Sequence, residues 1–243
     1  MKNLLRWEMK QSFKSKAFWG FGIVFVLATF LLNLLDIFST EDATGLDMFV
    51  KNCSNINSFF LLSFGIFAGM HVAGAFEERR IQAAVMAGNS RLNIVLAKYL
   101  SFSMAIAVFT AASVGLSSIP AFLHGTETGI ESFGTLMIQC VLYVFAQISF
   151  LSICFVISIY VKSLGAAIGI SFAVLLAIDV CVELVANKSW GETVIRHTAI
   201  GQTMLSLAES SSKSMLTSIW VSALGVLLTV VAAYIIFRKD ELK

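Results

Sequence analysis

Six apolar blocks, each long enough to cross a lipid bilayer, constrain the fold of this chain more than any other feature. A transmembrane helix needs about 20 mostly apolar residues. The blocks of this length lie at about 17–38, 56–76, 94–123, 136–161, 166–185 and 219–237. Only 13% of the residues are charged, against about 25% in a typical soluble domain, so a water-soluble fold would lack the polar surface to cover itself. The sequence therefore predicts an all-α polytopic membrane protein in which residues 1–243 form one domain.

The positive charges predict how these spans are oriented. Six spans place both termini on one side of the membrane, together with the loops that follow spans two and four. That side carries 13 of the 17 lysines and arginines. Because the cytoplasmic flanks of membrane proteins are enriched in lysine and arginine, we expect both termini and the loop after span two to be cytoplasmic.

Two segments outside the spans are expected to be helical. Leu4, Leu5 and Trp7 lie among lysines before span one, which predicts an amphipathic helix at the membrane interface. The alternative is a basic flank that only sets the topology. Between spans five and six, residues 186–218 carry apolar side chains near helical spacing, which favours a helical element on the outer face over a flexible loop.

No catalytic or metal-binding constellation is evident in the sequence. It contains no HExxH motif and no P-loop. The three histidines and four cysteines are scattered without metal-ligand spacing. We therefore expect no catalytic residue, no bound metal and no cofactor in this chain.

Three ionisable residues in the apolar blocks are candidate functional sites, because such groups are costly inside a membrane. His71 lies in span two, where it is either a functional group or a neutral imidazole hydrogen-bonded inside the bundle. Asp179 and Glu183 are four residues apart and share one helical face near the outer end of span five. They form either a mouth that attracts cations or a pair of carboxylates that reach interfacial water.

Small residues predict close helix contacts at two places. Gly65 and Gly69 form a GxxxG pattern in span two, and Gly165 and Gly169 form another where span five begins. This spacing lets helix backbones approach closely. Both patterns favour contacts between helices or subunits without specifying a function.

A compact charged stretch, residues 77–91, separates spans two and three. A helix over about 78–87 would place Ile81 and Val85 on one apolar stripe. Gly88 is expected to end this helix, and the residues after it to cap the next one. The result would be a short helix held between two fixed points.

The charged stretch and the start of span three together show a pattern. It consists of the run 77–82, then Gly88, then Ser90-Arg91, and then Lys98 seven residues after the arginine. It resembles the region after span two in ABC type-2 transporter permeases. The layout agrees over most of the chain: an amphipathic N-terminal helix, six spans, both ends inside and an enlarged loop before span six. The chain departs from the family pattern at Arg80-Ile81, where a Gly-Thr pair is usual. Its compact size and Gly88 resemble permeases of bacterial peptide-antibiotic (lantibiotic) export or immunity systems.

The resemblance implies a transporter subunit without an active site of its own. Two permease subunits, identical or related, would pair in a bacterial plasma membrane. Each would bind a separately encoded cytoplasmic ATPase subunit, and these two ATPase copies would hold ATP and magnesium. The assembly would export an amphipathic substrate such as a peptide antibiotic. Membrane lipid is an expected partner, and nucleic acid is not.

The same resemblance implies that the segment around 77–90 is the coupling helix, which seats in a groove of the ATPase. Ile81 and Val85 would supply apolar contact, and the charged residues would fix the register. The residues expected at this contact are Glu77, Glu78, Arg79, Arg80, Ile81, Val85, Ser90 and Arg91.

Two other functions stay open at this point. An ion-coupled secondary carrier or channel would use His71, Asp179 or Glu183 for coupling. A non-transporting membrane sensor or scaffold subunit would bind its ligand through residues 186–218.

Overall fold

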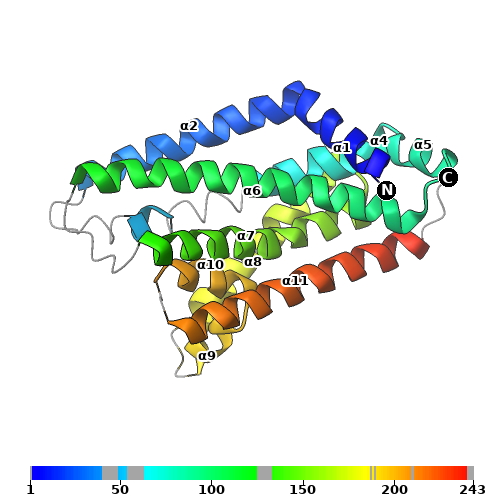
Figure 1. Cartoon of the computed structure of the whole chain (residues 1–243). Coiled ribbons are helices and arrows are strands. Elements are labelled where there is room, and N and C mark those ends of the chain that lie inside the picture. The colour runs from blue at the N-terminus through cyan, green and yellow to red at the C-terminus, as the bar shows by residue number, and fades with distance from the viewer. Residues whose placement is uncertain are drawn as a thin grey trace.

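The computed structural model is almost entirely helical over the residues that it describes (Figure 1). These residues are 2–39, 49–53, 63–124, 133–186, 188, 190–208 and 211–239. None of them lies in a β-strand. The all-α fold predicted from the sequence is confirmed for this part of the chain.

Five of the described helices are long and apolar enough to cross a membrane. They are α2 (Lys16–Ser39), α6 (Arg91–His124), α7 (Phe133–Val161), α8 (Leu164–Ala186) and α11 (Ser212–Lys239). Each contains one of the predicted apolar blocks and extends beyond it. The last helix begins seven residues earlier than the predicted start at about residue 219. The chain is therefore a multi-pass membrane protein.

The second predicted span, 56–76, is described only from residue 63 onward. Residues 63–77 are helical, and they include a π-helix, η1 (Gly69–Ala73), followed by the short helix α4 (Gly74–Glu77). A π-helical turn inside an α-helix frequently marks a functional site, and this one carries His71. A sixth span, and with it the cytoplasmic placement of the termini, stays a prediction.

Helices α6 and α7 form the centre of the bundle. Over their apolar windows 61% and 56% of the residues are buried, whereas α8 and α11 are each only 11% buried. A cluster of phenylalanine rings joins α2, the segment 63–77 and α6. Its members are Phe18, Phe21, Phe25, Phe64, Phe67 and Phe109. The large apolar side chains on the outer faces of α8 and α11 are exposed, as expected for helices that contact lipid.

Only the first of the two GxxxG patterns makes a close contact within the described chain. A Cβ atom on Gly69 would lie 2.5 Å from Ile168 Cγ1, so the segment 63–77 packs directly on α8. Among the described atoms, none lies within 4 Å of the corresponding position at Gly165 or Gly169. The second pattern therefore faces outward on α8.

The region between α8 and α11 is helical, as predicted. It contains α9 (Gly191–Arg196) and α10 (Ala199–Ala208). Helix α10 packs against α7 and α11 and buries Ile200, Thr203 and Leu207. These contacts make α10 part of the bundle instead of a loose loop.

Helices α1 (Lys2–Lys14) and α5 (Arg80–Met86) lie at the end of the bundle opposite α9 and α10, where α11 also ends (Figure 1). Arg91, in the first turn of α6, joins α6 to the last turn of α11 at this end of the bundle. Its Nη1 donates to the carbonyl oxygens of Phe237 and Arg238 at 3.0 and 2.8 Å. The charged stretch 77–91 is therefore joined to the C-terminal end of the described chain.

Candidate functional site

Two residues with left-handed backbone set the limits of α5. Arg79 has φ 55° and ψ 17° before the helix, and Gly88 has φ 82° after it. The Arg79 N–H donates to the Phe76 carbonyl and the Arg79 carbonyl accepts the Ala83 N–H, both at 3.0 Å. One residue thus ends α4 and begins α5. Because this conformation costs a non-glycine residue about 1–2 kcal/mol, the surrounding contacts must hold the sharp break before α5 in place.

The end of α5 and the start of α6 form as the sequence predicts. The Gly88 N–H donates to the Val85 carbonyl at 2.9 Å. The Asn89 N–H donates to the Ala84 carbonyl at 3.4 Å. This is the hydrogen-bond pattern of a Schellman C-cap. The Ser90 hydroxyl then accepts the Asn93 N–H at 3.3 Å and caps α6. The roles of Gly88 as a helix stop and Ser90 as a helix cap are confirmed.

The apolar stripe of α5 faces the bundle. Ile81 is only 3% exposed and packs with Phe76 and Phe237, and Val85 is half-buried against the same core. The prediction that Ile81 supplies exposed apolar contact to a partner is therefore wrong. A seven-residue helix has room for one apolar stripe, and the core of the chain takes it. The exposed apolar side chain is instead Met86, at 82%, which sequence reasoning missed although it lies off the stripe of Ile81 and Val85.

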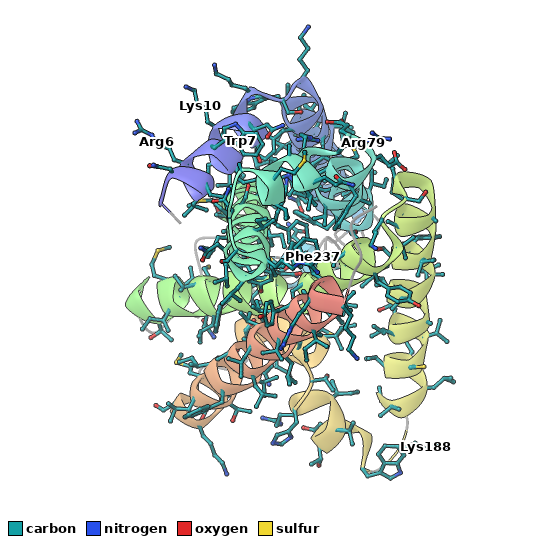
Figure 2. The ribbon with its side chains drawn as sticks, turned by 90° about the vertical axis from the view of Figure 1, so that its right-hand side faces the viewer. Arg6, Trp7, Lys10, Arg79, Lys188 and Phe237 are labelled. Atoms are coloured by element: carbon teal, nitrogen blue, oxygen red, sulfur yellow. The ribbon has the colours of Figure 1, made fainter. Side chains whose placement is uncertain are left out.

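Most of the charged side chains in the stretch bind within the chain. Glu77 Oε1 accepts the backbone N–H of Leu164 at 2.7 Å and so caps α8. Glu78 Oε2 lies 2.6 Å from Arg80 Nε. Arg79 is exposed, and Figure 2, which faces this end of the bundle, shows it at the periphery. Of the charged residues among the eight predicted for the contact, Glu77, Glu78 and Arg79 are exposed, whereas Arg80 and Arg91 are half-buried.

Helix α1 is held against α6 by a buried ion pair. Glu8 Oε2 lies 2.7 Å from Lys98 Nζ, and both side chains are 4% exposed. One turn further along, the hydroxyl oxygens of Ser12 and Ser101 are 3.1 Å apart. The predicted N-terminal helix is confirmed, but its bundle-facing side carries an acid, while Lys10 is exposed.

A polar cleft, hereafter the α1 cleft, lies between α1 and the segment 69–80. Its inner cavity has a volume of about 220 Å³ and adjoins a shallow groove of about 580 Å³. Residues lining the inner cavity include Glu8, Phe18, Phe67, His71, Glu77 and Leu164. The groove is lined by Trp7, Lys10 and Lys14. Gln11 and Arg80 line both parts.

The three ionisable candidates in the apolar blocks do not form one site. His71 stacks on Phe67 with a centroid distance of 5.5 Å and an interplanar angle of 7°. Leu164, at the start of α8, lines the same cavity as His71, and Asp179 lies about 22 Å further along that helix. Asp179 is half-buried and Glu183 is exposed on α8, and both alternatives for this pair stay predictions. Within the described ranges, no group of His, Cys, Asp and Glu side chains is arranged to hold a metal ion.

The match to a protein family covers nearly the whole chain. The model of a family described as "Protein of unknown function (DUF2705)" matches residues 9–242. The chain belongs to this family. No curated protein matches the chain. The region matched by the DUF2705 model includes all of α5 and every helix from α2 to α11, so the candidate site lies within the part that defines the family.

Proposed function

We propose that this DUF2705 protein is the membrane-spanning permease subunit of an ATP-binding-cassette exporter, and that α5 binds a separate ATPase subunit. The observation that carries the proposal is how α5 is held. It is a seven-residue helix with Ala83 and Met86 exposed, bounded by left-handed residues on both sides and anchored on its inner face by Ile81. A short helix fixed in this way moves together with its neighbours, so a push from a bound partner reaches both the segment 63–77 and α6.

The outward side of α5 supplies the contact residues in this proposal. Arg79, Ala83 and Met86 are exposed. The flexible, polarizable side chain of Met86 fits an apolar groove of a partner. The charge of Arg79 orients the approach, and Glu78 and Arg80 hold each other at its edge. These residues replace Ile81 as the proposed apolar and charged contacts.

The remaining parts of the proposal follow the resemblance to ABC type-2 permeases. Two permease subunits, identical or related, pair in a bacterial plasma membrane with this end of the bundle in the cytoplasm. Two ATPase subunits hold ATP and magnesium. ATP-driven closure of the ATPase pair expels an amphipathic substrate such as a peptide antibiotic, while this chain performs no catalysis.

The contact is tested by co-expressing the chain with the ATPase encoded in an adjacent reading frame and measuring how much ATPase co-purifies. We expect Met86→Gln to weaken the complex about tenfold, since one buried side chain is worth about 1.5 kcal/mol. Charge reversal of both Arg79 and Arg80 should weaken it further without preventing membrane insertion. Met204→Gln is the matched control, because Met204 is an exposed methionine on α10 at the other end. Equal assembly of all these variants with the ATPase would show that α5 is not the contact.

Transport itself is tested by reconstituting the chain in vesicles. Transport that needs both the ATPase and ATP supports the exporter. Transport by the chain alone under an ion gradient would support an ion-coupled carrier or channel instead. Ligand binding without transport would support a sensor or scaffold subunit.

A further inference from the structure

The α1 cleft separates opposite charges over a short distance. In the inner cavity, Glu8 is paired with Lys98, and Glu78 is paired with Arg80. The carboxylate of Glu77, which also lines the inner cavity, therefore gives this lining one net negative charge. The adjoining groove carries the two exposed ammonium groups of Lys10 and Lys14. A ligand that fits both parts has a cationic end and an anionic end.

Buried polar atoms in the inner cavity lack partners. Gln11 Oε1 and His71 Nε2 are buried and, within the described chain, accept or donate no hydrogen bond. Both residues line the inner cavity. Buried polar atoms are normally satisfied, so unpaired ones need an explanation such as a ligand. The amide oxygen of Gln11 accepts hydrogen bonds only, and a neutral His71 with its proton on Nδ1 offers a second acceptor. Together they call for a ligand with N–H or O–H donors.

The side chains around the cleft are those that collect at the level of lipid headgroups. Trp7 lines the groove and Trp19 is exposed just after it, at the start of the first spanning helix. Tryptophan side chains and snorkelling lysines collect at the membrane–water interface. Phe18 and Phe67 form an apolar wall of the inner cavity on the side of α2 and the segment 63–77. A headgroup in the cleft therefore stays connected to acyl chains in the bilayer.

We propose that the α1 cleft binds the headgroup of an aminophospholipid. The phosphate lies in the groove against Lys10 and Lys14, and the primary ammonium enters the inner cavity and donates to Gln11 and His71. A phosphate without an ammonium would bring no positive charge near Glu77, whose carboxylate the N-terminus of α8 compensates only in part. A quaternary ammonium has no N–H and would leave both acceptors unpaired. This inference goes beyond the proposed export function and does not depend on it.

The test is a native mass spectrometry titration of the delipidated full chain with lipids that share the same acyl chains. We expect phosphatidylethanolamine to bind about tenfold more tightly than phosphatidylcholine or phosphatidylglycerol, as one additional charge-assisted hydrogen bond would give. Equal binding of ethanolamine and choline lipids would overturn the ammonium assignment. Tighter binding of phosphatidylglycerol would overturn it as well. Soluble O-phosphoethanolamine that binds as tightly as the lipid would show that the ligand is a free phosphate ester and not a membrane lipid.

Variants locate the site. Replacing Lys10 and Lys14 together by Gln should weaken binding of phosphatidylethanolamine about tenfold or more. Arg6→Gln, an exposed cation of the same helix (Figure 2) that is not among the residues lining the groove, should leave it unchanged. Gln11→Leu should lower the preference for ethanolamine over choline towards one while phosphate-driven binding persists. A lysine variant that behaves like Arg6→Gln would overturn the location. The comparison of lipids on the unmodified chain needs no variant to fold.

Discussion

The buried ion pair between Glu8 and Lys98 gives the sharpest prediction about stability. At a separation of 2.7 Å and an effective dielectric constant of about 20, the attraction between the two charges is about 6 kcal/mol. It is opposed by a desolvation penalty of several kcal/mol for each ion. Glu8→Gln keeps the side-chain shape but leaves the Lys98 ammonium buried without its counter-charge. We therefore expect the free energy of unfolding to fall by about 3–5 kcal/mol.

Removing both charges should have a much smaller effect. In a variant with methionine at both Glu8 and Lys98, no charge is left buried and the apolar side chains keep the contact between α1 and α6. Replacing a buried ion pair by apolar residues is often neutral or stabilising by about 1–4 kcal/mol. The double-mutant cycle through the two single methionine variants should therefore show strong coupling.

The measurement is an SDS titration in mixed micelles, with unfolding followed by circular dichroism. The matched control is the exposed pair Glu192–Arg196, which is also a glutamate–cation pair, at 3.1 Å, but has side chains 80% and 33% exposed. Glu192→Gln should change the free energy by less than about 0.5 kcal/mol. A loss for Glu8→Gln no larger than in this control would refute the buried pair. A double methionine variant that loses the sum of the two single losses would refute it as well.

Three further variants test how the helices are joined. Gly88→Ala should lower the free energy of unfolding by about 1–2 kcal/mol, because alanine is strained at φ 82°. As the control in the same titration, Gly115→Ala, in open space within α6, should raise the free energy of unfolding by about 0.5–1 kcal/mol. Gly69→Ala should lower the free energy of unfolding by about 1–3 kcal/mol, since the new Cβ would lie 2.5 Å from a side-chain atom of α8. Gly169→Ala should leave the free energy of unfolding unchanged. Equal losses for the two variants would contradict the packing of the segment 63–77 on α8. Arg91→Met should raise amide hydrogen exchange in the last turn of α11 about tenfold, because that turn loses two charge-assisted hydrogen bonds; unchanged exchange would show that Arg91 does not anchor α11.

The local features of this protein could be predicted from the sequence. The apolar blocks predicted five of the described helices, and the charges around Trp7 predicted α1. Gly88 and Ser90 marked the boundary between α5 and α6 correctly. These features depend on hydropathy over one helix or on hydrogen bonds between residues a few positions apart. A single sequence carries that information directly.

The long-range features could not be predicted in this way. The sequence pattern of the apolar stripe of α5 is the same whether the stripe contacts a partner or the core. Only the position of Phe237 against Ile81 decides that the stripe faces the core. Arg91 carried the resemblance to a transporter family, but the structure also gives it a role in holding α11. Each of these contacts joins helices that are far apart in the chain.

By itself, the sequence determined that this chain is a multi-pass helical membrane protein with a short capped helix between two apolar segments. The tertiary structure decided which side of that helix is free, that Glu8 pairs with Lys98, and that α1 encloses a polar cleft beside His71. The physical reason is that helix formation and capping are local, whereas burial and ion pairing depend on which helices become neighbours. The hydropathy of a helix predicts that it is removed from water, but it does not predict which other helices it packs against.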